Sequence, residues 1–392
     1  MSEVVLNDIC ELIVDCPHST AYDEGTGYPL VRTPNIGRGR IIYSGMHRVC
    51  EEVYNKRNAR AIPQTNDLIF AREATAGNVA LIQEGEKVCL GQRTVLIRPN
   101  ANLVNPAFLT YHLLAPEQQY KLLSTANGAT VAHVNMPTIR NLKLSLPPLA
   151  TQHRISTILS RYDSLIENYQ KQIKLLEEAA QRLYKEWFVD FHFPGHETTK
   201  IVDGVPEGWE KKPISQLGEY LNGFAFKPSD WQKSGKPIIK IKEMGNGVSN
   251  DTPRNNGERV PAKYLVKAGD LLFSWSATLM VIVWSGEEGW LNQHLFKVTP
   301  SKGIEREFLL QSISNTIEEF QNLTTGSTMK HIQRNKLDQV FVNVPNDEIM
   351  KRYSSIAEKE RTEILHLSSQ IRLLSEARDR LLPKLMGGEI KF

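Results

Sequence analysis

"NGATVAHVNMPTIRNLKLSLPPLATQHRI" occupies residues 127–155, and a related stretch, "TGSTMKHIQRNKLDQVFVNVPNDEIMKRY", occupies residues 325–353. His133 in the first stretch corresponds to His331 in the second, 198 positions later. In both stretches apolar residues then alternate with polar ones until a proline follows. This alternation predicts a half-buried strand that the proline ends. Because the repeat spans about half of the 392 residues, it indicates a duplicated domain rather than a short structural repeat.

The duplication extends well upstream of these stretches. Two further pairs match, "NDLIFAREATAGNVALI" (66–82) with "GDLLFSWSATLMVIVW" (269–284), and "LGQRTVLIRP" (90–99) with "LNQHLFKVTP" (291–300). The separation between matching residues falls from 203 to 198 along the chain, which indicates small insertions in loops. Each copy therefore contains several short strands followed by one helical segment. The helical segments are predicted at 106–124 and 305–323.

A long apolar stripe follows each copy. Its members are Ile158, Tyr162, Leu165, Tyr169, Ile173, Leu176, Ala180, Leu183 and Trp187 after the first copy, and Ile364, Leu367, Ile371, Leu374, Leu381 and Leu385 after the second. Their spacing by threes and fours predicts helices whose stripes are buried against another helix. Asn346 is a candidate N-cap for the second helix. We expect the outward helix faces to be the surfaces on which partner proteins dock.

Chain connectivity predicts how the two helices pair. Each helix leaves its own globule, so two helices that pack together while their globules sit apart must run antiparallel. The predicted fold is mixed α/β, with two similar globules in a pseudo-twofold arrangement joined by a long antiparallel two-helix coiled coil. The expected boundaries are 1–148 for the first globule, 149–193 for the first helical region, 194–204 for a linker, 205–345 for the second globule, and 346–392 for the second helical region and C-terminal tail.

Composition is that of an ordinary globular protein, with 41% hydrophobic and 23% charged residues. The longest apolar run, residues 278–284, is too short to cross a bilayer, and "MSEVVLND" has no features of a secretory signal. The four cysteines lack paired spacing, which favours free thiols and a cytoplasmic location. A net charge of +3 does not by itself indicate nucleic-acid binding, so local basic patches must carry any such interaction.

Two similar globules on a spacer suit a periodic ligand, and duplex DNA is the most obvious one. Basic and polar clusters support this interpretation at 32–40 ("RTPNIGRGR"), 55–60 ("NKRNAR") and 225–242 ("AFKPSDWQKSGKPIIKIK"). Lys and Arg neutralise phosphates, whereas Arg, Asn, Gln and Ser side chains reach base edges. Each cluster taken alone is equally well explained as a solvated basic loop.

The candidate DNA-binding residues lie in both copies. They are His18, Thr20, Arg32, Asn35, Arg38, Arg72, Thr130 and His133 in the first copy, and Lys227, Lys240, Ser274, Ser276, Ser327, Lys330 and His331 in the second. "GSTMKHI" (326–332) resembles a phosphate-binding turn, because backbone N–H groups and the charge of Lys330 could hold an anion. A strand that ends in a polar turn explains Ser274 and Ser276 equally well.

Signals of catalysis are weak. "NPAF" (105–108) resembles a motif that grips a flipped adenine, but its counterpart in the second copy is the unrelated "REF" (306–308). No glycine-rich cofactor loop or nucleotide-binding loop is present, and His192 and His196 lack further ligands for a metal. We therefore expect no catalytic residue, no metal and no cofactor bound by this chain. A stand-alone methyltransferase or nuclease and a protein-only scaffold remain the alternatives.

The ordered motifs resemble the specificity subunits of type I restriction-modification systems. "DCPHSTAYDEG", "RTPNIGRGRI", "DLIFAREATAG" and "LKLSLPPLATQHRI" carry the resemblance in the first half, and "VPEGWE", "GFAFKPSDW", "GDLLFSWSAT" and "LLPKLMGGEI" carry it in the second. The resemblance implies two target-recognition domains, each reading one half of a bipartite asymmetric sequence in double-stranded DNA. The first half departs from this pattern because it lacks a "PEGW" entry.

The same resemblance implies partner proteins and their cofactors. The helical regions would dock two methyltransferase subunits, which transfer a methyl group from S-adenosylmethionine to adenine. Motor-nuclease subunits, which use ATP and Mg²⁺, would join the full complex. In this reading the chain itself recognises DNA and catalyses nothing.

Overall fold

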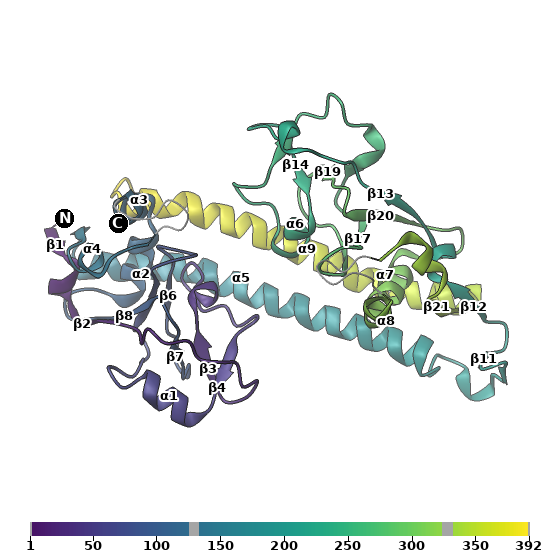
Figure 1. The fold of residues 1–392 in the computed structure, drawn as a ribbon, viewed down its shortest axis with the longest axis horizontal. Helices are drawn as coiled ribbons and strands as arrows, with labels where there is room; N and C mark the ends of the chain where they lie inside the picture. Colours follow the sequence, from purple (N-terminus) through teal and green to yellow (C-terminus); the bar gives the residue numbers. More distant parts are fainter. Residues whose placement is uncertain (1, 125–132, 324–331, 391–392) are drawn as a thin grey trace. The chain divides into compact units, whose positions relative to one another are not determined.

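The computed structural model describes residues 2–124, 133–323 and 332–390. The described chain divides into two compact units (Figure 1). Unit 1 comprises residues 1–166 together with 373–392, and unit 2 comprises residues 167–372. Each unit therefore contains one copy of the repeat and a section of each long helix. The two halves of the sequence do not map onto the two units, because the C-terminal helix ends inside unit 1.

Unit 1 is built on two sheets. The larger sheet has the order β2 (Cys10–Asp15), β8 (Thr94–Pro99), β5 (Leu68–Ala71) and β6 (Val79–Leu81), and all of its pairings are antiparallel. Leu68 and Phe70 of β5 face one hydrophobic cluster, whereas Ile69 and Ala71 face another. Successive side chains of a strand point to opposite faces, so this all-apolar strand is buried on both sides.

Unit 2 repeats this sheet. Its order is β13 (Gly218–Asn222), β20 (Leu295–Pro300), β17 (Leu271–Ser274) and β18 (Met280–Val283). Leu271 and Phe273 face the main cluster of unit 2 and Leu272 faces a smaller one, as in β5. The predicted duplication and the mixed α/β class are confirmed by this shared strand order.

A smaller sheet completes each unit. In unit 1 it has the order β4 (His47–Val49), β3 (Tyr28–Val31) and β7 (Cys89–Leu90), followed in sequence after β4 by the short helix α1 (Glu51–Arg57). In unit 2 the order is β15 (Arg254–Asn255), β14 (Lys236–Ile239), β19 (Gly289–Leu291) and β16 (Leu265–Val266). In both sheets the central strand pairs antiparallel on one side and parallel on the other.

Two short ribbons contain the alternating strands that the sequence predicts. β1 (Ser2–Val5) pairs with β9 (Lys143–Leu146), and β12 (Glu210–Pro213) pairs with β21 (Phe341–Val344), both antiparallel. The alternate apolar residues of β9 and β21 are buried, as expected. β10 (Ile201–Val202) and β11 (Val205–Pro206) form a further small hairpin at the entry to the second copy.

The prediction of one continuous helix in each copy is wrong. Residues 106–124 form α2 (Pro106–Leu114) and α3 (Pro116–Ser124), and the second copy forms α7 (Arg306–Asn315) and α8 (Ile317–Asn322). Ala115 adopts an extended conformation because it precedes Pro116, whose ring disfavours the helical region for that residue. At the equivalent break the Thr316 hydroxyl donates to the Ser312 carbonyl, a local bond that competes with the regular helix ladder.

The two long helices are present. They are α5 (Leu149–Tyr184), which continues into a π-turn at Lys185–Val189, and α9 (Asp347–Met386). The predicted cap is confirmed, because the Ile349 N–H donates to Asn346 Oδ1 at 3.0 Å. Within unit 2 the end of α5 meets the start of α9, where the rings of Trp187 and Tyr353 lie 6.0 Å apart. The helix sections in this unit therefore run antiparallel.

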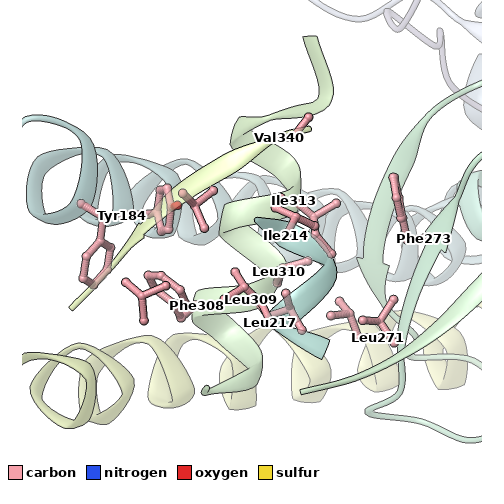
Figure 2. Close-up of a cluster of buried hydrophobic side chains, with 14 of the residues drawn as sticks. Tyr184, Ile214, Leu217, Leu271, Phe273, Phe308, Leu309, Leu310, Ile313 and Val340 are labelled. Atoms are coloured by element: carbon pink, nitrogen blue, oxygen red, sulfur yellow. The ribbon is translucent and has the colours of Figure 1, made fainter. Parts of the chain in front are cut away.

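The core of unit 2 lies between the large sheet and the helices (Figure 2). In that view Phe308, Leu309 and Ile313 of α7 lie between Phe273 of the sheet and Tyr184 of α5. Among the described residues, no helix is long and apolar enough to cross a membrane. Nor do the described His, Cys, Asp and Glu side chains form a group of three or more that could hold a metal ion.

Candidate nucleic-acid interface

A short motif occurs at the same place in both small sheets. It reads "GYPLVR" at residues 27–32, across β3, and "GKPIIK" at residues 235–240, across β14. The opening glycines have φ angles of +96° at Gly27 and +104° at Gly235, a conformation that favours glycine. A Cβ atom would come within 2.3 Å of the Val49 carbonyl oxygen in the first copy and 2.4 Å of the corresponding oxygen in the second. Glycine therefore lets the central strand lie close to its neighbour.

The motif ends on a basic residue in both units. Arg32 and Lys240 each precede a short helical turn, formed by Thr33–Asn35 in unit 1 and by α6 (Ile241–Asn246) in unit 2. The Arg32 N–H donates to Asn35 Oδ1 at 3.3 Å, and the Lys240 N–H donates to the Glu243 carboxylate at 3.1 Å. The fold thus brings the predicted residues Arg32 and Lys240 to equivalent positions.

Side chains near the two basic residues differ. Lys240 Nζ lies 4.6 Å from the ring centre of Trp231, which is 49% exposed. Such a cation–π pair presents an aromatic face and a positive charge together. In unit 1, Arg32 Nη2 donates to the Gly45 carbonyl at 3.1 Å. Arg32 Nε is buried and has no hydrogen-bond acceptor in the described part of the chain.

A cavity of about 210 Å³ lies beside Arg32. Its polar lining residues are Thr20, Arg32, Thr33, Arg57, Gln92 and Arg93. The Arg57 guanidinium is already used, since it donates to the carbonyls of Leu90, Ser19 and Pro17. Arg32, Arg93 and Gln92 contact the Gly45 carbonyl, Glu73 and the His18 carbonyl respectively, each through one nitrogen. Their remaining N–H groups are the donors with which this cavity could bind an anionic or hydrogen-bonding ligand.

A second cluster lies at the end of β5 and contains three of the predicted residues. Arg72 donates through Nη1 to Asp15 Oδ2 at 2.7 Å, and its Nη2 lies 2.8 Å from His133 Nε2. His18 Nε2 lies 3.3 Å from the same Asp15 oxygen. Arg72 also donates through Nε to the Val134 carbonyl and is only 8% exposed. It is therefore held inside the unit, where it positions His133 and Asp15.

Glu73 extends this cluster toward the small sheet. Its carboxylate lies 2.5 Å from His133 Nδ1 and forms an ion pair with Arg93. Burial raises the pKa of Glu73, but the hydrogen bonds from His133 and Arg93 outweigh it, so that the pKa lies below its ordinary value. Arg93 joins this network to the cavity beside Arg32.

Unit 2 has the same frame with different side chains. Trp275 corresponds to Arg72, because the N–H of each donates to the carbonyl of a residue across the sheet, His294 in unit 2 and Arg93 in unit 1. Trp275 Nε1 donates to Asn222 Oδ1 at 3.2 Å, in place of the arginine–aspartate pair of unit 1. The ring centres of Trp275 and His294 lie 5.6 Å apart. An aromatic and amide group thus replaces a charged network.

Other predicted residues lie elsewhere. Lys227 is exposed, and its N–H donates to Asp230 in a short turn. The Arg38 guanidinium donates to the Leu114 carbonyl at 2.9 Å, at the end of α2. Ser274 is buried, and its hydroxyl donates to the Thr278 carbonyl within the turn after β17. Ser276 is also buried. Their roles in DNA binding stay predictions.

Four candidates lie outside the described residues, namely Thr130, Ser327, Lys330 and His331. The proposed phosphate-binding turn at 326–332 therefore also stays a prediction. Of the predicted partner-helix residues, Ile364 and Leu367 are buried, and Leu165 is 43% exposed. The rest are partly buried, namely Ile158, Tyr162, Ile173, Leu176, Leu183, Ile371, Leu374 and Leu381.

Sequence reasoning missed several residues of this interface. The sequence does not single out four residues that adjoin the candidate contacts. Gln92 and Arg93 line the cavity beside Arg32, Trp231 lies against Lys240, and Asn222 accepts a hydrogen bond from Trp275. The repeated glycine–x–proline motif before Arg32 and Lys240 was the signal that could have located the small sheet in both copies.

Comparison with known proteins agrees with this architecture. The family described as the type I restriction modification DNA specificity domain matches residues 1–178 and 206–371. The specificity subunit of the type I restriction enzyme MjaIX from Methanocaldococcus jannaschii is 23% identical, over 98% of this chain and 92% of the relative. The specificity subunit of the HindI enzyme from Haemophilus influenzae is 26% identical, over 76% of this chain and 80% of the relative.

A solved structure shares the fold. The type I restriction-modification S subunit from M. genitalium aligns with a TM-score of 0.54 at 14% identity, covering 98% of this chain and 95% of that one. The family match spans both copies of the repeat, including the motif that ends on Arg32 and Lys240. The chain therefore belongs to the type I restriction-modification DNA specificity family.

Proposed function

We propose that this chain is the non-catalytic DNA-recognition subunit of a type I restriction-modification complex, and that each unit reads one half of a bipartite asymmetric site. One observation carries the proposal. Equivalent positions at the end of the shared small-sheet motif hold Arg32 beside a cavity in unit 1 but Lys240 beside the exposed Trp231 in unit 2. A common backbone with different polar side chains suits two readers of different base sequences, because base edges are distinguished by the side chains that reach them.

The small sheets supply the basic residues that such reading requires. Arg32 with the adjoining cavity offers guanidinium donors, which bind guanine edges or phosphates in a bidentate manner. Lys240 beside the exposed Trp231 offers a positive charge and an aromatic face. We call these two sites, Arg32 with its cavity and Lys240 with Trp231, the basic corners. We infer that both basic corners face DNA, and that the Arg72 cluster holds the loops of unit 1 in position behind the first of them.

Membership of this family supports a proposal about the partners of this chain. We propose that two methyltransferase subunits, which use S-adenosylmethionine, dock on the outward faces of α5 and α9, and that motor-nuclease subunits using ATP and Mg²⁺ complete the complex. We also propose that the two long helices set the gap between the half-sites. A 36-residue helix such as α5 rises about 54 Å, the length of about 16 base-pair steps of roughly 3.4 Å. Its DNA substrate implies a cytoplasmic location.

The two basic corners should act on different halves of the target. We expect Arg32→Ala to lower the affinity of the assembled complex for its site by about 5–150-fold, as for the loss of one good bidentate contact. Base preference should relax in one half of the site only. Lys240→Ala should relax the other half. Selection of bound sequences from a random DNA pool, followed by sequencing, measures both effects.

Lys302→Ala is the matched control, because Lys302 is an exposed basic residue in the turn after β20 and lies outside both small-sheet motifs and both long helices. It should leave the selected sequence unchanged. If Arg32→Ala and Lys240→Ala relaxed the same half, or if neither altered base preference, the assignment of one reader to each unit would be wrong.

A further inference from the structure

Each unit receives the end of a long helix in its core. In unit 2 this is the end of α5, where Tyr184 and Phe188 join the main hydrophobic cluster. In unit 1 it is the end of α9, where Leu382 and Met386 join the corresponding cluster. The two helix ends are equivalent in the repeat, since Leu382 follows Tyr184 and Met386 follows Phe188 by the same 198 positions. We call the contact between the helix end and α2 or α7 the socket of that unit.

In the socket of unit 2, the helix end supplies large aromatic side chains, and α7 supplies the small side chain of Ser312. The Tyr184 hydroxyl donates to Ser312 Oγ at 3.1 Å (Figure 2 shows Tyr184 beside Phe308). The ring centres of Tyr184 and Phe308 lie 5.8 Å apart, and those of Phe188 and Phe308 lie 4.9 Å apart with the rings nearly perpendicular. These four side chains are all buried.

The socket of unit 1 reverses these sizes. His112 occupies the position of Ser312, and its ring stacks on Phe108 with ring centres 5.4 Å apart. His112 Nδ1 lies 3.4 Å from Met386 Sδ. Burial lowers the pKa of His112 to about 4, so the imidazole is neutral at pH 7 and fills space as an uncharged ring. Here α2 supplies the large side chain, His112, and the helix end supplies Leu382 and Met386, which are smaller and aliphatic.

Size therefore decides which helix end fits each socket. A tyrosine in place of Leu382 would meet the His112 ring, and overfilled cores force side chains out of their preferred rotamers. A leucine in place of Tyr184 would leave a void beside Ser312 and an unsatisfied hydroxyl, and neither defect is readily relieved by relaxation of a packed core.

A buried charge reinforces the distinction in unit 1. Asp163 of α5 accepts from the Tyr111 hydroxyl at 2.5 Å and from Arg378 Nη1 of α9 at 2.7 Å. The residue equivalent to Arg378 at the end of α5 is Ala180, 198 positions earlier. A second copy of α5 placed in unit 1 would therefore remove Arg378 from the buried Asp163 carboxylate, and loss of one partner of a buried ion pair is costly.

We propose that the two sockets are selective interaction surfaces, and that each accepts the helix end that follows the other copy of the repeat and rejects the end that follows its own. The partner that fits unit 1 is the aliphatic, arginine-bearing end of α9, and the partner that fits unit 2 is the aromatic end of α5. This selectivity directs the chain to close with its own second helix rather than with the first helix of a second copy. It does not depend on what the units bind.

Reciprocal exchange in the intact chain tests the proposal. In unit 1, His112→Ser and Leu382→Tyr should each lower the thermal unfolding midpoint by about 3–8 °C, through a void and through overpacking respectively. The double variant should regain at least half of the summed loss, because the introduced tyrosine hydroxyl then meets an introduced serine, as in unit 2. Leu381→Tyr combined with His112→Ser is the control and should show no recovery.

The mirrored exchange in unit 2 gives a second, independent measurement. Ser312→His and Tyr184→Leu should each destabilise, and together they should recover in the same way. Circular dichroism follows unfolding of the whole chain, and tryptophan fluorescence follows unit 2 alone, since all six tryptophans lie in residues 187–290. A change in the circular-dichroism transition that fluorescence does not show is assigned to unit 1. Recovery in either unit supports selection at the socket. Additive losses in both units would overturn it.

Discussion

Replacing Arg361 with methionine is expected to lower the free energy of unfolding of unit 2 by about 3 kcal/mol, near the lower end of the range for a broken buried ion pair. Arg361 is 6% exposed, and its Nε donates to Glu307 Oε2 at 2.9 Å. Glu307 is 2% exposed and keeps one other cation, Arg306, at 3.0 Å. In the variant the buried Glu307 carboxylate would lose one of these two arginine partners. The ion pair with Arg306 remains, and it limits the decrease in the free energy of unfolding.

Arg352→Met provides the matched control. Arg352 lies on the same helix, α9, and pairs with Glu348 at 2.9 Å, but both side chains are more than half exposed. Exposed pairs of this kind contribute only about 0.3–0.5 kcal/mol. Urea unfolding followed by tryptophan fluorescence reports on unit 2, because it contains every tryptophan of the chain. Equal losses for the two variants would show that burial does not decide the strength of the Arg361 pair.

Replacing the glycine that opens each small-sheet motif should damage one half of DNA recognition at a time. Gly27→Ala forces alanine into a φ of +96° and brings its Cβ within 2.3 Å of the Val49 carbonyl oxygen. The left-handed conformation alone costs about 1–2 kcal/mol. The backbone contact must also be relieved by displacing β3, and Arg32 follows directly after β3. We therefore expect at least tenfold weaker discrimination in the half-site read by unit 1.

Two exposed glycines serve as controls, because substituting them tests the cost of the left-handed backbone conformation without a close contact to the neighbouring strand. Gly25 has a φ of +72° and Gly247 a φ of +75°, and a Cβ atom at either would meet nothing within 4 Å. Gly25→Ala should therefore destabilise modestly and leave the selected DNA sequence unchanged. Gly235→Ala compared with Gly247→Ala makes the same test in unit 2. If Gly25→Ala impaired recognition as strongly as Gly27→Ala, close strand approach would not be the reason for the glycine.

The duplicated architecture could be predicted because it depends on local patterns. Alternating apolar residues near 143–146 and 341–344, and helical stripes with a cap at Asn346, are visible within short windows of sequence. The break at Ala115 was also visible, as a proline at the next position, but the apolar pattern continues through it. The apolar period predicts one helix there, but the backbone restriction on the residue before Pro116 ends it.

The interface was harder to predict because it depends on contacts between distant residues. The central strand β3 pairs in parallel with β7, and Leu30 meets Cys89 across that pair. Lys240 lies 208 positions after Arg32, whereas the later matches differ by 203 or fewer, so an insertion obscures their equivalence. Trp275 and Arg72 share a position but no chemistry. Positions at which the two copies carry different chemistry lack the similarity by which a repeat is found.

Positive charge alone does not identify which candidate residues are free to contact DNA. Arg72 looked like a DNA contact in the sequence, yet its guanidinium is bound to Asp15, His133 and the Val134 carbonyl. A sequence shows that an arginine is present but not whether carboxylates from other strands surround it. Lys227 and Arg32 differ in the same respect, since only the structure shows which of them lies beside a cavity.

The central claim is that each unit reads its own half of the target. The most direct measurement exchanges residues 201–340 for the matching segment of a related specificity subunit, with Ser312 retained to receive Tyr184. The assembled parent and exchanged complexes are then each used to select binding sites from random DNA. We expect one half of the selected sequence to be replaced, while the other half and the gap between them stay unchanged. Simultaneous change of both halves, or of neither, would contradict independent reading by the two units.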